Sequence, residues 1–290
     1  MSLADRNIVT MPSSPNFTRS EFTLVRTIGT TISPFTGQQK VQEFANVYWT
    51  ANVVLPPQRR ATAVNWQSFL AEAKGPANSF LFTDPDAKSP LGTHSAATVT
   101  AAVRINDTSE TLSFSASNNR ITAGTNVFTN TFPGDFVHIT GATNENNNGT
   151  HKILTHDSNA IITVDTNLTT ESSTAGCKLR QNISGAEALS FTTTGSGTIK
   201  AGDYLGLLSG SSTSHMPFQL VMATEDAHFN SSNGAVKVQP RLRKDLTAGH
   251  LITFSNARGL FRLVGKEIGW SANQVSTYGM QFQVIEDISA

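Results

Sequence analysis

The sequence is short of charge, and this shortage excludes one class of protein. Charged residues make up 14% of the 290 residues, against roughly 25% in a typical soluble protein. The 21 basic and 21 acidic side chains cancel, so no cationic excess is left to neutralise nucleic-acid phosphates. A net charge near zero also promotes self-association, which fits a subunit of a larger assembly.

Cysteine and long apolar runs are also scarce. Cys177 is the only cysteine, which excludes an internal disulfide and a cysteine-based metal site. We expect it to be a small buried apolar side chain. Residues 1–10 hold no long apolar run, so we expect neither a secretory signal nor a membrane span.

Thr, Ser, Asn and Gly are abundant instead. Thr suits a pleated, half-buried surface, and Asn and Gly suit the turns between short strands. The chain is long enough to bury a sizeable core. The composition therefore predicts a mainly-β protein, a β-sandwich or barrel with many turns.

Residues 21–54 have the pattern of strands. Every second residue from Ala45 to Val53 is apolar, a period of two that marks a half-buried strand. Neither proline of Leu55-Pro56-Pro57 can donate to a ladder, so the strand ends there. Residues 79–82 predict a further strand, closed by the turn-prone Asp84-Pro85-Asp86.

One amphipathic helix is predicted between these strands, over residues 60–74. Gly75 in a left-handed cap, followed by Pro76, is its stop signal. Arg59 and Arg60 lie where the helix dipole disfavours cations, so they are either solvated or held by an acidic partner. Four apolar residues share one helix face, which we expect to dock on the sheet: Trp66, Phe69, Leu70 and Ala73.

The strand pattern changes between residues 97 and 182, where strands are short and turns are rich in Asn. Residues 132–139 predict a tight turn into a strand, and residues 143–150 a polar loop that ends in a hairpin-type Asn-Gly. Residues 151–154 and 160–164 are predicted to pair. We therefore expect one β domain, residues 1–96 plus 183–290, interrupted by a small inserted β module, residues 97–182.

The strand pattern of the first 96 residues resumes after residue 182. Residues 200–205 predict a turn into a strand and share the pattern Gly-Asp-aromatic-aliphatic with residues 132–137. A shared turn type explains this likeness as well as an internal repeat does. Further strands are predicted at 218–223 and 235–239, joined by the loop 225–234, and at 278–284.

No catalytic motif is recognisable, and we expect the chain not to be an enzyme, with no catalytic, cofactor-binding or metal-ligating residues. Glu286 and Asp287 are adjacent on a strand and so face opposite ways, which argues against paired carboxylates. Asp84 and Asp86 lack a third metal ligand. The histidines have no fixed partners: His94, His151, His156, His215, His228 and His250.

Sugar binding is the alternative function that the residues leave open. Exposed aromatic residues and Asn/Thr-rich loops on β modules can bind carbohydrate. Tyr204 and the 143–150 loop are the candidates, although ordinary hairpin loops have the same composition.

A series of motifs recurs in order along most of the chain. In that order and spacing the chain resembles the distal tail (baseplate) proteins of long-tailed, siphovirus-like bacteriophages. Residues 133–136 with 148–153 resemble a small β module that recurs in phage structural proteins. The motifs of the main resemblance are Glu43–Ala51, Leu55–Pro57, Trp66–Leu70, Gly75, Ser79–Phe82, Lys200–Tyr204, Gln239–Arg243, Gly259–Leu263, Gly269–Asn273 and Tyr278–Phe282.

The resemblance implies a structural role in the virion. Members of that family combine a β-sandwich with a helix, and six copies form a ring at the distal end of the tail. The ring joins the tail tube protein to the tail hub protein and surrounds the tape-measure protein. The inserted module would serve side fibres or host glycan, the chain would be made in the host cytoplasm, and the family has no catalytic residues to carry over.

Overall fold

The chain forms two compact units. The computed structural model describes residues 7–93, 98–105, 108–212, 216–230, 233–274 and 276–288. The first unit comprises residues 1–89, 216–220 and 254–290, and the second comprises residues 90–215 and 221–253. The predicted mainly-β class is confirmed, with a single α-helix among the described residues.

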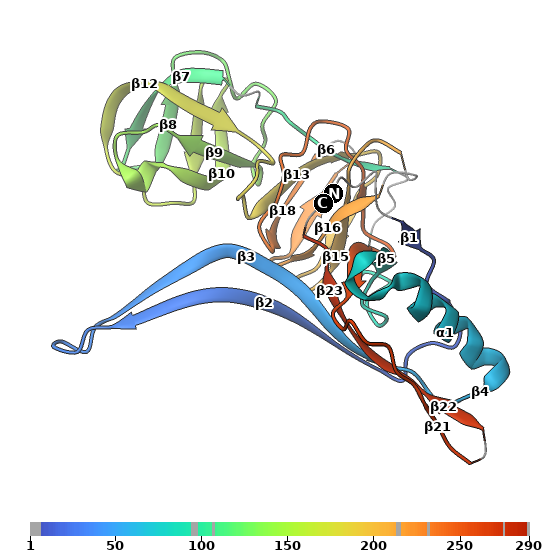
Figure 1. Cartoon of the computed structure of the whole chain (residues 1–290). Coiled ribbons are helices and arrows are strands. Elements are labelled where there is room, and N and C mark those ends of the chain that lie inside the picture. Colours follow the sequence, from blue (N-terminus) through green and yellow to red (C-terminus); the bar gives the residue numbers. More distant parts are fainter. Residues whose placement is uncertain are drawn as a thin grey trace. The chain divides into compact units, whose positions relative to one another are not determined.

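A six-stranded sheet forms the centre of the first unit (Figure 1). Its strand order is β1-β5-β20-β23-β3-β2, antiparallel except for β1 against β5. Its strands are β1 (Ile8–Val9), β2 (Arg19–Ile32), β3 (Gln39–Val54), β5 (Ser79–Phe82), β20 (Gly259–Leu263) and β23 (Gln281–Glu286). A smaller sheet, β21-β22-β4, contains β4 (Gln58–Arg59), β21 (Ser271–Ala272) and β22 (Thr277–Gly279).

The predicted alternation in β3 holds over its second half only. Val47, Trp49, Ala51 and Val53 are buried, whereas Ala45 is exposed. The reason is that β23 pairs with β3 only from Thr50 to Val54. Beyond the end of β23, the β2–β3 pair has no core on which an inward-facing side chain could pack.

Helix α1 (Arg60–Ala73) docks on the sheet through the predicted face. Trp66, Phe69, Leu70 and Ala73 are all buried. The ring of Phe69 lies 5.0 Å from that of Phe80 in β5, edge to face, a favoured aromatic geometry. Full burial of a side chain as large as phenylalanine stabilises the fold by roughly 1.5–3 kcal/mol, so aromatic packing dominates this unit.

The helix ends one residue before the predicted cap. Lys74, with φ of 51°, is the left-handed C-cap, and its amide donates to the Ala71 carbonyl. Gly75 also has a positive φ, 62°, and begins the 3-10 turn η2 (Gly75–Ala77). A Cβ at Gly75 would lie 2.9 Å from the Gly265 carbonyl oxygen, so glycine is required here for space as well as for φ.

Another six-stranded sheet, in the order β19-β15-β16-β18-β13-β6, lies mostly in the second unit, because residues 217–220 of β16 belong to the first. β15 is buried along its whole length, as expected of a strand with a neighbour on each side. The sheet contains β6 (Val99–Ala101), β13 (Ala188–Thr193), β15 (Tyr204–Leu208), β16 (Pro217–Ala223), β18 (Gly234–Gln239) and β19 (Ile252–Thr253), beside a pair formed by β14 (Gly197–Ile199) and β17 (Ala227–Phe229).

A closed six-stranded barrel completes the second unit. Its core is apolar and includes Leu112, Phe128, Ile153 and Cys177, each fully buried. The predicted pairing of residues 151–154 with 160–164 holds at Ile153, which faces Val164, but the strand continues past residue 154, so that His156 faces Ile162. The strands are β7 (Thr108–Ser115), β8 (Arg120–Ala123), β9 (Phe136–Thr140), β10 (Gly149–Ser158), β11 (Ile161–Val164) and β12 (Glu171–Arg180).

The barrel strands all fall inside the predicted insert, residues 97–182. The division into 1–96 plus 183–290 and 97–182 nevertheless stays a prediction. The two compact units are divided elsewhere, and the barrel belongs to the second unit together with most of the β19–β6 sheet.

The two Gly-Asp segments adopt the same turn. Gly134 has φ of 98° and Gly202 has φ of 99°, and each following aspartate amide donates to the carbonyl three residues before it at 3.0 Å. Each turn is also bracketed by a facing residue. Ile153 exchanges backbone hydrogen bonds with Gly134 and Asp135, and Ala223 does so with Gly202 and Asp203. The likeness in sequence therefore corresponds to a shared turn that leads the chain into a strand.

Buried polar groups clamp the two segments that enter and leave the barrel. Arg104 pairs with Asp135, with Nη1 3.3 Å from Oδ2, and its Nη2 donates to the Phe191 carbonyl. The Gln181 side chain accepts from the Arg104 amide and donates to the Phe136 carbonyl. Such satisfied buried networks rigidify a structure, so the barrel is not merely tethered by its linkers.

Candidate functional site

Asp84, Glu286 and Asp287, considered above as metal ligands or paired carboxylates, accept hydrogen bonds from groups of the first unit. No cluster of three or more His, Cys, Asp or Glu side chains lies within the described ranges in a position to hold a metal. Asp84 accepts a hydrogen bond from the Asp86 amide at 3.2 Å. This turn, in which a side chain caps nearby backbone, is a common use of aspartate.

Glu286 and Asp287 are both fully buried, but they belong to separate networks. Glu286 accepts from the amides of Trp49 and Leu220, at 3.1 and 3.2 Å. Asp287 accepts from the Ser79 hydroxyl at 2.7 Å. The two carboxylates therefore join strands of the first unit and do not face a common substrate.

The histidines of the barrel bond to backbone carbonyls. The Nε2 atom of His151 lies 3.0 Å from the Asn147 oxygen, and that of His156 lies 2.9 Å from the Phe128 oxygen. Burial lowers the pKa of His151, which favours its neutral form. His228 lies in β17 and His250 contacts the Thr247 hydroxyl, whereas His94 and His215 lie outside the described residues.

The sugar-binding candidates are not arranged as an exposed platform. Tyr204, predicted as an exposed aromatic residue, is buried in the central strand β15. The 143–150 loop contains the 3-10 turn η3 (Glu145–Asn147) instead of a hairpin Asn-Gly turn. Asn147 is fully buried, and Asn148 bonds to both backbone groups of Ala142.

A single carboxylate, that of Glu171, holds this loop in place. It accepts from the amides of Thr143 and Asn144 and from the Asn147 side chain. Desolvation alone would raise the pKa of Glu171, but these hydrogen bonds and one from Thr174 outweigh it and lower the pKa to about 2. The side chains of Asn147 and Asn148 are therefore engaged within the protein.

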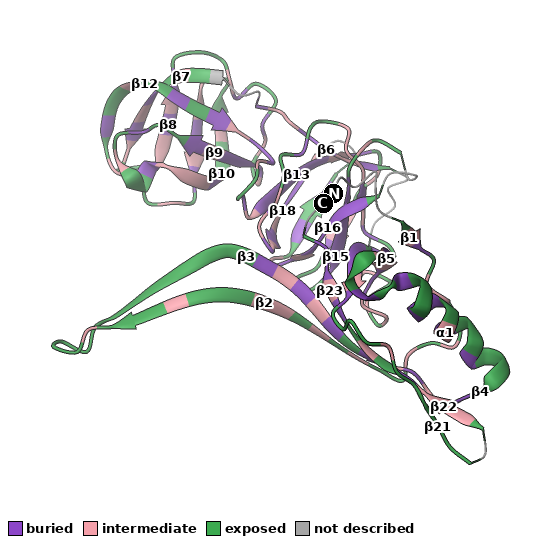
Figure 2. Ribbon diagram, viewed as in Figure 1, coloured by how far each residue is buried: buried purple, intermediate pink, exposed green. Residues whose placement is uncertain are grey.

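The most exposed apolar surface of the first unit is the β2–β3 ribbon beyond the sheet. Residues 26–46, which we call the arm, contain no buried residue. Figure 2 shows β2 and β3 exposed along the arm, with buried positions of β3 confined to the part beside β23. An isolated two-stranded ribbon is marginally stable in water at best, so the arm lacks the packing that normally supports its length.

The register divides the arm into two faces. Thr30 faces Val41 and Ile32 faces Gln39, so Ile28, Ile32 and Val41 share one face. Their exposed fractions are 51%, 64% and 59%. These three side chains, which we call the apolar stripe, alternate with Thr30, Gln39 and Glu43 on that face. Phe35 at the tip is 96% exposed. Exposed apolar groups gathered in this way mark an interaction surface or an aggregation hazard.

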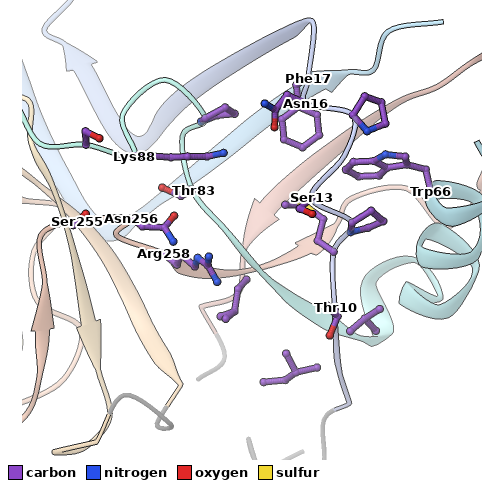
Figure 3. Close-up of a pocket in the computed structure, with 18 of the residues that line it drawn as sticks. Thr10, Ser13, Asn16, Phe17, Trp66, Thr83, Lys88, Ser255, Asn256 and Arg258 are labelled. Carbon is purple, nitrogen blue, oxygen red and sulfur yellow. The ribbon is translucent and has the colours of Figure 1, made fainter. Parts of the chain in front are cut away.

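A sizeable cavity lies elsewhere in the first unit. It has a volume of about 750 Å³ and is lined by the segment 8–17, Trp66 of helix α1, Leu81 of β5 and residues of the segment 255–258 that precedes β20. Figure 3 shows Thr83, Lys88, Asn256 and Arg258 on one side of it and Trp66 on the other. Its size is that of a small-molecule site.

No family model matches the chain. No curated protein matches it either. In the part of the chain that the structure describes, no helix has the length and apolar character to cross a membrane.

Proposed function

We propose that the chain is a structural subunit of a bacteriophage tail that forms the distal adaptor ring. The motif series resembles that of distal tail proteins, and the proposal takes its family from that resemblance. The assembly role is supported by the exposure of the arm. Its apolar stripe and the Phe35 tip are unfavourable in an isolated subunit, because they leave apolar surface in water.

The arm also offers an open strand edge. β2 is the last strand of its sheet, with β3 as its only neighbour among the described strands. An open edge is a liability in a monomer and a joint in an assembly, because its free backbone groups can pair with another chain. A head-to-tail contact that repeats around an axis closes into a ring.

The partners follow from the same proposal. Six copies would form the ring, the tail tube protein and the tail hub protein would bind its two faces, and the tape-measure protein would pass through it. The ring would lie at the distal end of the tail in the virion. A host glycan or a side fibre would engage the barrel.

Removal of the apolar stripe tests the assembly role. We expect Ile32→Thr with Val41→Thr to abolish a higher oligomer of the purified protein, as measured by sedimentation velocity. Thr retains the β-branched shape that suits a strand, so the fold should persist. Val64→Thr, at an exposed position of α1, is the matched control and should leave the oligomer intact.

The size of that oligomer tests the ring itself. Electron micrographs of negatively stained protein should show closed rings, and antibody against the chain should label the distal end of phage tails. A wild-type protein that stays monomeric at high concentration, or particles that lack stoichiometric amounts of the chain, would contradict the proposal.

A further inference from the structure

The cavity of the first unit has cations and apolar groups on opposite sides. We infer that it binds an amphipathic anion, meaning an aliphatic or aromatic body that carries a carboxylate or another oxyanion. This inference is independent of the ring proposal, because it depends on the cavity and not on the arm.

The charge of the cavity is positive. Lys88 and Arg258 both line it, and no described lining residue is acidic. Neither cation makes an ion pair with another described residue. A pair of unneutralised cations in one cavity favours a negatively charged ligand, and an arginine beside it favours planar oxyanions in particular.

The arginine is held in position by a neighbouring amide. With the Asn256 side-chain oxygen turned toward Arg258, it accepts from Nε at 3.2 Å and from Nη2 at 2.7 Å. The backbone N–H of Asn256 donates to the Lys88 carbonyl at 2.6 Å. Two of the five guanidinium N–H donors are used in this way, and three remain for a ligand.

A buried hydroxyl is left without a partner in the same cavity. Thr83 is only 8% exposed, and its Oγ1 atom makes no hydrogen bond within the described residues. An unpaired buried hydroxyl is costly. A turn of the Thr83 side chain toward the cavity would let its hydroxyl donate to a ligand oxygen held by Lys88 and Arg258, which would remove that cost.

The cavity also has an apolar lining, next to the polar Thr10, Ser13 and Asn16. Val9, Met11, Phe17 and Trp66 supply it, and the rings of Phe17 and Trp66 pack 5.5 Å apart. Figure 3 shows the Trp66 indole across the cavity from Lys88 and Arg258. The apolar groups would contact the body of the ligand, and Lys88 and Arg258 would bind its anionic group. Ligand pockets commonly combine an apolar lining with a few polar or charged groups in this way.

Two matched fluorescent probes test the inference. Anilinonaphthalene sulfonate has an aromatic body and an anionic group, and N-phenylnaphthylamine has the same body without the charge. We expect Lys88→Gln with Arg258→Gln to weaken binding of the sulfonate about tenfold, because charge-assisted hydrogen bonds are lost. Binding of the neutral probe should stay within about twofold.

Control variants distinguish the cavity from general charge attraction. Arg59→Gln with Arg60→Gln removes two exposed cations of the same unit outside the cavity and should leave both affinities unchanged. Thr83→Val should weaken sulfonate binding and raise the melting temperature of the free protein. Equal sulfonate affinity in the cavity variant and the wild type, or an equal loss in the control variant, would overturn the inference.

Discussion

Arg104 and Asp135 form an ion pair almost completely removed from solvent, with 6% and 0% of their side chains exposed. Desolvation raises the pKa of Asp135 and lowers that of Arg104, while the mutual attraction of the pair opposes both shifts. Asp135 also accepts from the Ser190 hydroxyl. The pair thus connects the turn before β9 to the segment that enters the barrel and to β13.

Breaking this pair should destabilise the second unit strongly. Asp135→Asn leaves the Arg104 charge buried without a counterion, and we expect a loss of about 3–5 kcal/mol. Denaturant unfolding at pH 7 measures it. A loss below about 1 kcal/mol, the level of an exposed pair, would contradict this account.

Removal of the other partner, Arg104, should carry a stability cost that depends on pH. In Arg104→Met the buried Asp135 loses its counterion, so its folded-state pKa rises further above the unfolded value. The folded state then binds the proton more tightly, and stability rises as the pH falls toward that raised pKa. The cost of Arg104→Met should therefore shrink between pH 7 and pH 5, and the cost of Asp135→Asn should not.

Glu171 should contribute stability that acid removes. Its pKa of about 2 lies below the ordinary value of 4.5, so the contribution is complete above pH 4.5 and is lost as the pH falls toward 2. Glu171→Gln should destabilise the protein at pH 7 by about 1–3 kcal/mol and abolish this acid-dependent part. Glu145→Gln, an exposed neighbour on the same loop, is the control, and an equal effect there would contradict the prediction.

The two matching turns should be equally sensitive to a side chain. Gly134→Ala and Gly202→Ala each force a Cβ into positive φ, and we expect each to cost about 1–2 kcal/mol. Thermal unfolding measures the loss. Gly124→Ala, where a Cβ meets only ordinary contacts at 3.6 Å or more, should be nearly neutral. A neutral Gly202→Ala would show that the turn tolerates another conformation.

A glycine at the C-cap of helix α1 should increase the stability of the protein. Lys74 occupies a left-handed conformation with φ of 51°, which costs an ordinary side chain roughly 1 kcal/mol. Lys74→Gly should therefore stabilise the protein by about 0.5–1 kcal/mol, visible as a higher melting temperature. Lys74→Ala keeps the strain and should give no such gain.

Local patterns predicted the elements whose formation depends on local sequence. The strand at Ser79–Phe82 matches the prediction, and helix α1 ends within a residue of it, because periodicity and Gly-Pro punctuation are local signals. The prediction of an exposed Tyr204 was wrong, although the apolar run Tyr204–Leu208 has the composition of a buried central strand. That run was the signal available in the sequence.

Features that depend on residues far apart in the sequence could not be predicted from local sequence patterns. Alternation in β3 continues through Ala45, and nothing there reveals that β23 stops pairing at Thr50. Likewise, Glu171 lies some 25 residues from the loop that it holds. The cavity is equally non-local, because Lys88 and Arg258 are brought together only by the fold.

The burial of Cys177 has a practical consequence for biochemistry. Its thiol is fully enclosed in the barrel core, and burial raises its pKa, so the reactive thiolate is scarce at neutral pH. Because the sequence holds no other cysteine, a cysteine introduced at an exposed position such as Phe35 would be the one rapidly alkylated group. Maleimide dyes or spin labels could then report on the tip of the arm without removal of any native residue elsewhere.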